Sequence, residues 1–310
     1  MRKGNLFDAV FLTRPMIMVP GWIFMFMGYF WAKGLPLFGL SIPLDPMFWI
    51  AFVSYSLEMG AVYILNQITD LESDRENRKL LILPEGLLSV RFAWAEAGVL
   101  GAVSLILAFL VGLPFVIIWF LSGLLGFLYS GPPNLKAQPI PNIILNMVGY
   151  GFLAVLAGWA VGGKFSWLAL LFCLPYAFGD GAVTAATMIP DIPGDRRAGE
   201  ETLAVRYGPK ATAWFAFACD ILALTTGLIA RDPIISLAAG LSAPLFLYSA
   251  IRTNDLSVKL SFRVSSFILA LLVGLRFPSL IALGLAVLLG SKLYYRLRFG
   301  IRDYPSLTGR

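Results

Sequence analysis

Apolar residues run along this chain in long uninterrupted stretches and do not alternate with polar ones. The stretches are roughly 18–25 residues long, the length a helix needs to cross about 30 Å of hydrocarbon. Strands of a membrane barrel alternate in polarity, and backbone groups in lipid must be hydrogen-bonded within their own segment. We therefore predict an all-α, polytopic membrane protein. Its spans are expected at residues 15–33, 46–68, 92–111, 113–130, 140–162, 165–190, 211–230 and 233–251.

The last apolar stretch, 260–297, is interrupted by Arg276 and Pro278. It is either one long broken helix or two short spans, and the pattern leaves both open. We therefore expect about nine transmembrane helices with a possible tenth at the C-terminus. We interpret residues 1–310 as a single integral membrane domain.

Two long polar segments, 66–91 and 190–210, interrupt the apolar pattern, and both are expected to be loops. Four predicted spans separate them, and an even number of crossings returns the chain to the same face. The segments on that face hold 15 Lys and Arg residues, whereas the opposite loops hold four. The positive-inside rule therefore places both loops on the cytoplasmic face. The five basic residues of the tail lie on the cytoplasmic side only if the last stretch crosses twice.

Composition narrows the function further. Apolar residues make up 58% and charged residues 14% of the chain, against roughly 45–50% and 25% in soluble domains. This excludes a soluble enzyme, a disordered protein and a disulfide scaffold. The chain has no His, which excludes a Ser-His-Asp triad or a His-ligated metal. We assign the net charge of +6 to loops facing anionic membrane lipids and not to nucleic-acid binding.

The first polar segment carries Asn66, Asp70 and Asp74 at a spacing of four residues. On a helix this spacing places all three side chains on one face. Two carboxylates and an amide on one face suit Mg²⁺, which prefers oxygen ligands and completes its shell with water and phosphate. The second segment repeats the spacing at Asp191 and Asp195 after an apolar run. The chain therefore has two weakly related halves, each ending in paired aspartates.

These motifs together indicate diphosphate chemistry. Four carboxylates in one cavity repel one another, and two Mg²⁺ ions would neutralise them and leave positive charge for a diphosphate. A diphosphate bound in this way is a good leaving group, and apolar helices suit an isoprenyl chain. Basic residues beside the motifs either hold phosphate oxygens or only satisfy topology; they are Arg14, Arg75, Arg78, Lys79, Arg196 and Arg197.

Two further acids, Glu58 and Asp180, lie within predicted spans, where charges are costly and usually face a cavity or a partner. Asp180 precedes Asp191 by close to three helical turns, so both lie on one face about 16 Å apart. Either acid binds the acceptor or acts as its base, or it is a hydrogen-bonded group within the bundle.

The combined motifs resemble the UbiA superfamily of intramembrane prenyltransferases. The resemblance is carried by Asn66-x-x-x-Asp70-x-x-x-Asp74, by Asp191-x-x-Gly-Asp195-Arg196, and by Tyr129-Ser-Gly-Pro-Pro-Asn-Leu-Lys136. Arg14-Pro15 at the start of the first span is also similar to the family, and the resemblance extends from Arg14 to at least Gly208. The chain departs from the family at Ile82, where an Arg is usual. This departure disfavours a carboxylated aromatic acceptor.

The resemblance implies nine transmembrane helices around a central cavity that opens sideways to lipid. It implies Mg²⁺-dependent transfer of a polyprenyl group from its diphosphate to a lipophilic acceptor. No protein partner is evident from the sequence. By carry-over, Asn66, Asp70, Asp74, Asp191 and Asp195 bind the diphosphate through Mg²⁺, and Tyr129 and Lys136 line or contact the diphosphate pocket. A phenolic or quinone precursor, a glycerol-phosphate lipid, a carotenoid end and a haem or chlorophyll precursor all stay open as acceptors. The alternative function is a membrane transporter of an anionic substrate.

Overall fold

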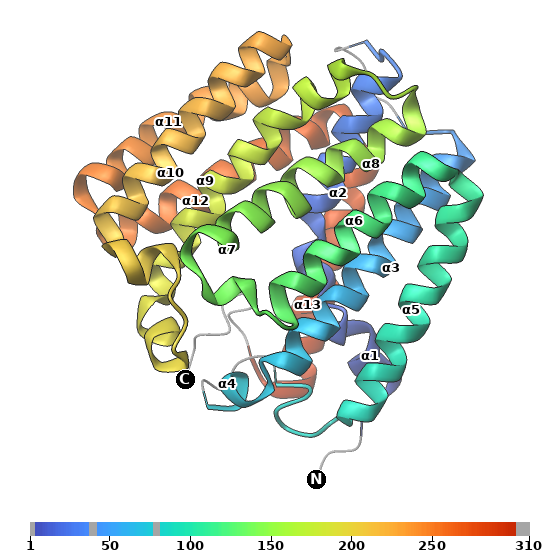
Figure 1. Ribbon diagram of the computed structural model, residues 1–310, viewed down its shortest axis with the longest axis vertical. Coiled ribbons are helices and arrows are strands. Elements are labelled where there is room, and N and C mark those ends of the chain that lie inside the picture. The colour runs from blue at the N-terminus through green and yellow to red at the C-terminus, as the bar shows by residue number, and fades with distance from the viewer. Residues whose placement is uncertain (1–3, 37–41, 77–80, 302–310) are drawn as a thin grey trace.

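A computed structural model describes residues 4–36, 42–76 and 81–301, and its regular structure within these ranges is helical (Figure 1). Three elements are short: α1 (Leu6–Leu12), α4 (Leu71–Glu76) and η1 (Leu135–Ala137). The others are α2 (Pro15–Ala32), α3 (Pro46–Thr69), α5 (Val90–Val111), α6 (Leu113–Ser130), α7 (Pro139–Asn146), η2 (Met147–Phe152), α8 (Leu153–Gly162), α9 (Trp167–Ala198), α10 (Leu203–Ala230), α11 (Pro233–Arg252), α12 (Asp255–Arg276) and α13 (Pro278–Phe299).

Within the described residues, ten helical segments are long and apolar enough to cross a membrane, with α7, η2 and α8 counted as one. This confirms an all-α, polytopic membrane protein. The stretch left open by the sequence is two helices, α12 and α13, separated by Phe277. Proline lacks an amide hydrogen but fits the first position of a helix, so Pro278 ends one span and begins the next. The structure therefore has one span more than the family resemblance implies.

The segment 190–210, expected as a loop, is largely helical, so that expectation was wrong. The segment 66–91 is helical only in part, at the end of α3, in α4 and at the start of α5. α9 continues through Pro190 and Pro193 to Ala198, where Gly199 takes a left-handed conformation with φ 71°. The last turn of α9 carries basic side chains, which interact favourably with the helix C-terminus. The residues of α9 therefore become polar after Pro190, about two turns before the helix ends at Ala198. α10 then begins at Leu203 and bends at Gly208 (φ 83°).

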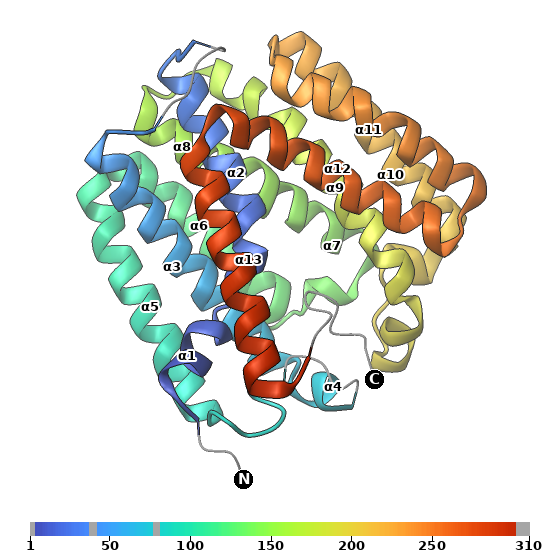
Figure 2. The same ribbon diagram turned by 180° about the vertical axis from the view of Figure 1, so that it is seen from behind.

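The two ends of the described chain meet on one side of the bundle. Asp8 of α1 is fully buried and accepts hydrogen bonds from Tyr294 Oη (2.7 Å) and Arg298 Nη2 (2.8 Å), both on α13. Figure 2 shows the last turns of α13 beside α1. An even number of crossings returns the chain to its starting side, in agreement with ten spans.

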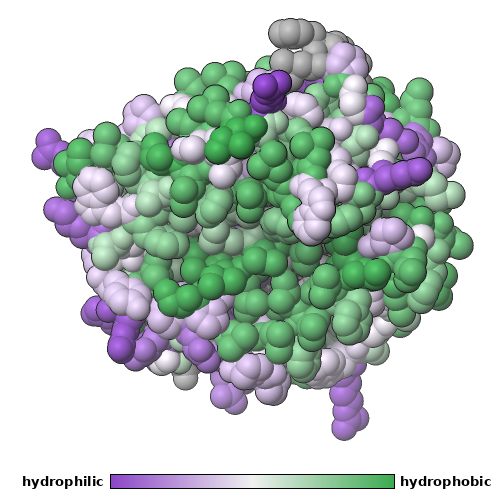
Figure 3. All heavy atoms as spheres, turned by 45° about the horizontal axis from the view of Figure 1, so that its top comes forward, coloured by the Kyte–Doolittle hydropathy of each residue, from purple (hydrophilic) through white to green (hydrophobic). Residues whose placement is uncertain are grey.

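The packing core is built around α2, which packs closely against α8. Gly28 and Gly158 make this approach possible: a methyl group on Gly28 would overlap the carbonyl oxygen of Val155, and one on Gly158 would overlap that of Met25. The face of the molecule drawn in Figure 3 is mostly apolar. Large apolar side chains elsewhere along the chain are also exposed, Leu297 to 75%, as expected for a surface that faces lipid.

Asp232 fixes the helices at the end of the bundle opposite the motifs. It is fully buried and caps α11 by accepting from the backbone N–H groups of Ile234 (3.0 Å) and Ile235 (3.2 Å). Its other oxygen accepts from Trp31 Nε1 of α2 (2.7 Å) and Tyr176 Oη of α9 (2.6 Å). One carboxylate thus joins three helices.

Candidate active site

The first aspartate motif lies where α3 ends. Asp70 caps α3 and α4 follows, yet backbone bonds from Asp70 N–H to Asn66 O (3.0 Å) and from Asp74 N–H to Asp70 O (2.8 Å) keep the helical spacing across the break. Asn66 Nδ2 donates to Asp70 Oδ2 (3.0 Å) and to Ser130 Oγ at the end of α6 (3.1 Å). Asp74 is buried. The spacing read from the sequence is therefore retained, although not on one unbroken helix.

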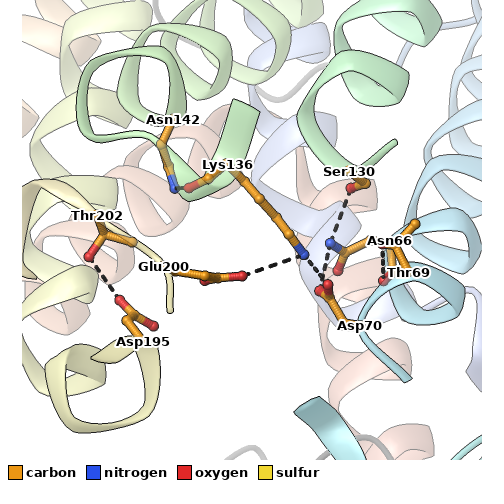
Figure 4. A network of polar contacts seen from close by, with 9 residues as sticks. All are labelled: Asn66, Thr69, Asp70, Ser130, Lys136, Asn142, Asp195, Glu200 and Thr202. Atoms are coloured by element: carbon orange, nitrogen blue, oxygen red, sulfur yellow. Dashed lines mark hydrogen bonds and ion pairs between the residues drawn. The ribbon is translucent and has the colours of Figure 1, made fainter. Parts of the chain in front are cut away.

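Lys136 lies between the two aspartate motifs (Figure 4). Its ammonium group points toward Asp70 of the first motif and toward Glu200, in the connection that follows the second motif. Lys136 is 6% exposed, forms an ion pair with Asp70, and lies 3.9 Å from Glu200 Oε1. Its backbone carbonyl accepts from Asn142 Nδ2 (2.5 Å), which ties η1 to α7. A buried cation thus bridges acidic groups from the two halves of the chain.

The second aspartate motif occupies the last turns of α9. Asp195 Oδ2 accepts from Thr202 Oγ1 (2.9 Å), as Figure 4 shows. The Glu201 N–H donates to the carbonyl of Ala137 (2.9 Å), so the connection between α9 and α10 is bound to η1. Asp191 is exposed on the same end of α9. Both motifs therefore lie at one end of the bundle.

A cavity of about 710 Å³ opens between the helices next to these motifs. Its lining includes Arg14, Asn66, Tyr129 and Asp180, all predicted from the sequence. The four motif aspartates and Lys136 are not among the lining residues. Arg14 has φ 56° and precedes Pro15, the first residue of α2. The predicted site is thus divided into a charged cluster and an adjoining, mainly apolar cavity.

Several predicted residues lie away from the cavity. Glu58 is 3% exposed and directed at α6, where an added Cβ on Gly123 would lie 3.3 Å from Glu58 Oε1. The structure does not place it among the cavity residues. Arg75 is exposed, and its Nε donates to the carbonyl of Pro84 at a long 3.4 Å. Arg196 and Arg197 are exposed in the last turn of α9, and Arg78 and Lys79 lie outside the described residues.

Ile82, which stands where the resembling family has an Arg, is 2% exposed. It packs in a hydrophobic cluster with Leu12, Ile64 and Tyr295. The position therefore contributes to packing beneath the first motif, and its side chain does not reach the cavity.

The oxygen-bearing side chains of the two aspartate motifs fit Mg²⁺. Within the described parts of the chain, no three acidic, thiol or imidazole side chains form a ready-made metal site. Mg²⁺ does not require one, because it is usually bound by one or two carboxylates and completed by substrate phosphates and water. Asp70 already attracts one cation, the Lys136 ammonium. The carboxylates of the two motifs would each offer hard oxygen ligands to an ion held against a diphosphate.

Sequence reasoning missed four polar residues of this region: Ser130, Asn146, Glu200 and Asp220. Ser130 and Asn146 line the cavity. Both are uncharged residues at the polar end of a helix, where the sequence does not distinguish them from their neighbours. Glu200 is one of two consecutive acidic residues, and its contact with Lys136 depends on the turn after α9. Asp220 had a usable signal, because it is a charged residue within a predicted span.

Comparison with known proteins agrees with this architecture. Residues 21–269 match the UbiA prenyltransferase family. The chain is 29% identical over 213 residues, 63% of its length and 53% of the relative's, to a probable homogentisate phytyltransferase 2 of Oryza sativa. It is 31% identical over 174 residues, 54% of its length and 60% of the relative's, to a digeranylgeranylglyceryl phosphate synthase of Sulfolobus acidocaldarius. The chain thus spans about half to three-fifths of these relatives' lengths.

The solved structure of a UbiA homologue from Archaeoglobus fulgidus bound to DMAPP and Mg²⁺ superposes with a TM-score of 0.67 at 22% identity. The superposition covers 90% of this chain and 98% of the other, so the fold is shared over almost its whole length. With the family match over residues 21–269, the chain belongs to the UbiA prenyltransferase family.

Proposed function

We propose that this chain transfers a prenyl group from an isoprenyl diphosphate to a lipophilic acceptor within the membrane, with two Mg²⁺ ions at the site. The acceptor is an aromatic or quinone precursor or a lipid. The position of Lys136 carries the proposal, because its buried ammonium joins Asp70 to the connection after the second motif. A diphosphate entering there meets acidic groups for metal and a basic group for phosphate at once.

The residue roles follow from these positions. Asn66, Asp70, Asp74, Asp191 and Asp195 are proposed to hold the metal, which when bound would stabilise charge on the leaving diphosphate. Lys136 is proposed to turn from the carboxylates to a phosphate oxygen. Arg14, at the start of α2, adds a second cation beside the cavity.

The prenyl chain is proposed to lie in the cavity next to this cluster. Side chains such as Ile17, Phe24 and Met59 line it and bring no charge toward an allylic carbon. Tyr129 lies beside Ser130 and Asn66, where the cavity adjoins the charged cluster. Its phenol ring can face the reacting carbon, and an aromatic face stabilises a developing allylic cation.

We further propose that the motif end faces the cytoplasm and that the chain is one membrane domain with two related halves. The excess of basic residues on the segments of this end supports the orientation. Transport, the alternative function, is disfavoured because transporter sites place their acids near the membrane midplane, whereas the four motif acids lie at one end.

The test is prenyl transfer by the full chain in lipid nanodiscs with radiolabelled geranylgeranyl diphosphate. An alkylated hydroquinone and an alkylglycerol phosphate serve as acceptors. We expect prenylated product that needs Mg²⁺, disappears with EDTA and falls at least a hundredfold in Asp70→Asn. Asp255→Asn, which alters an acid with a side chain 72% exposed at the start of α12, is the matched control. Absence of both product and diphosphate release with each acceptor would reject the proposal.

A further inference from the structure

The cavity has two unlike walls. On the side of α2, α3 and η2, polar groups are satisfied by the protein: the hydroxyls of Tyr63 (3.3 Å) and Tyr150 both donate to the carbonyl of Ile17. On the side of α9 to α12, the lining carries carboxylates and hydroxyls, and two of these groups, on Asp220 and Ser265, lack a protein partner. A ligand in this cavity therefore finds its unused polar contacts on one wall.

Asp220 of α10 is the clearest of these groups. It is 3% exposed and lines the cavity, and its Oδ2 accepts no hydrogen bond from the protein. A buried carboxylate oxygen without a partner costs free energy, and acids within spans usually serve a function. The position is explained if a bound molecule donates to it.

Ser265 of α12 repeats this arrangement on the same wall. It is 7% exposed and lines the cavity, and its Oγ has no hydrogen-bond partner. Ser242 of α11 also lines the wall. Asp180 of α9 lies at a depth similar to Asp220, because the two are nearly equally far along the chain from the turn that joins their antiparallel helices. Among the residues that the structure describes, Asp180 has one hydrogen-bond partner, Thr184 Oγ1, at a long 3.5 Å.

Aromatic side chains flank these polar groups. Phe246 follows Ser242 by one turn of α11, Phe262 precedes Ser265 by one turn of α12, and both line the cavity. Aromatic faces pack well against a planar ring.

Arg14 is the one basic side chain among the described lining residues, and it comes from the other wall, at the start of α2. Two acids with no cation on this wall disfavour a carboxylate or phosphate there.

We propose that Asp220, Asp180 and Ser265 form a subsite for an uncharged, hydroxylated aromatic ring, whose hydroxyl groups donate to the two carboxylates. The ring lies between Phe246 and Phe262. Resting on the proposed prenyl transfer, this assigns the acceptor as a phenol or hydroquinone without an acidic group on its inner side. About 16 Å of helix separates Asp180, inside the cavity, from Asp191 of the second motif. The ring therefore binds Asp180 and Asp220 through the hydroxyl groups on its inner side, and its opposite, reactive side faces the diphosphate donor.

The experiment compares methylhydroquinone with its dimethyl ether, which has the same ring but donates no hydrogen bond. Binding to the full chain in nanodiscs is measured with and without geranyl thiodiphosphate and Mg²⁺. Hydrogen bonds to charged groups contribute about 1.5–3 kcal/mol, which corresponds to a preference of about 10- to 100-fold for the hydroquinone. We expect Asp220→Leu to reduce this preference at least tenfold, since Asp180 stays as an acceptor, and Ser265→Ala to reduce it less. Affinity for the donor analogue stays unchanged in both variants.

Thermal stability separates a binding role from a packing role. Removing an unpartnered buried charge should leave the melting temperature of Asp220→Asn unchanged or raised, whereas loss of a packing residue lowers it. Asp255→Asn is the control with normal selectivity. Equal binding of hydroquinone and ether, no binding of either, or full selectivity in Asp220→Leu would overturn the subsite. If selectivity is present but the donor analogue does not bind, the subsite stands and the proposed transferase function fails.

Discussion

Replacing Lys136 by Met should change metal binding and donor binding in opposite directions. The ammonium group contacts Asp70 and lies 3.9 Å from Glu200. It therefore neutralises the carboxylates that a metal ion needs. Without this cation, the carboxylates attract Mg²⁺ more strongly, but a diphosphate loses a partner. We expect Lys136→Met to bind Mg²⁺ alone more tightly and to bind geranyl thiodiphosphate with Mg²⁺ more weakly.

The magnitude follows from distance and exposure. Two unit charges about 4 Å apart interact by about 4 kcal/mol at an effective dielectric constant of about 20. The Lys136 side chain is 7% exposed, but those of Asp70 and Glu200 are 25% and 26% exposed. Solvent reduces the interaction, and we take about 1.4–2.8 kcal/mol, which is a 10- to 100-fold gain in Mg²⁺ affinity.

A Mg²⁺ titration followed by thermal unfolding in detergent measures this gain. A ligand that binds only the folded state stabilises it by RT ln(1 + [L]/Kd). The variant should therefore reach the same stabilisation as wild type at a Mg²⁺ concentration that is lower by about tenfold or more. Lys259→Met is the control, because Lys259 pairs with Asp255 on the surface at 2.7 Å and its side chain is 41% exposed. Equal Mg²⁺ responses of wild type and Lys136→Met would refute the competition between ammonium and metal.

Two further predictions concern the fold. Asp232→Ala leaves buried donors on α2 and α9 unpaired and removes a helix cap, and should cost about 2–4 kcal/mol of unfolding free energy in SDS titration. Asp45→Ala, which removes a cap with one hydrogen bond, should cost about 1 kcal/mol; equal losses would contradict this. Gly158→Ala should abolish folded yield in size-exclusion chromatography because its methyl overlaps Met25. Gly98→Ala, with nothing within 4 Å, should behave as wild type, and a normal Gly158→Ala would refute the close packing.

The spans could be predicted because membrane insertion depends on the length of apolar runs, which the sequence contains directly. Helix ends could not, since a helix leaving the membrane keeps its hydrogen bonds after its residues become polar. The expected 165–190 span is α9, which extends to Ala198 through two prolines. Conversely, Pro278 separates α12 from α13. The effect of a proline therefore depended on its neighbours and not on its presence.

The candidate site could also be predicted only in part from the sequence. Four-residue spacings predict that Asn66 and Asp70 lie together, and Asn66 donates to Asp70 at 3.0 Å. Asp180 was expected at depth near the motif helix face, and it lines the cavity. Glu58 had equal standing in the sequence but is directed at α6, because the rotation of a buried helix is set by tertiary packing. Contacts across the bundle, such as Lys136 with Glu200, carry no local signal.

Donor binding is the most direct test of the central claim. Isothermal titration of the purified full chain with geranylgeranyl thiodiphosphate, with and without Mg²⁺, measures it without a known acceptor. The account predicts binding that requires Mg²⁺ and is lost in Asp70→Ala but kept in Asp255→Ala. Failure to bind the analogue with any divalent cation, or undiminished binding in Asp70→Ala, would contradict it.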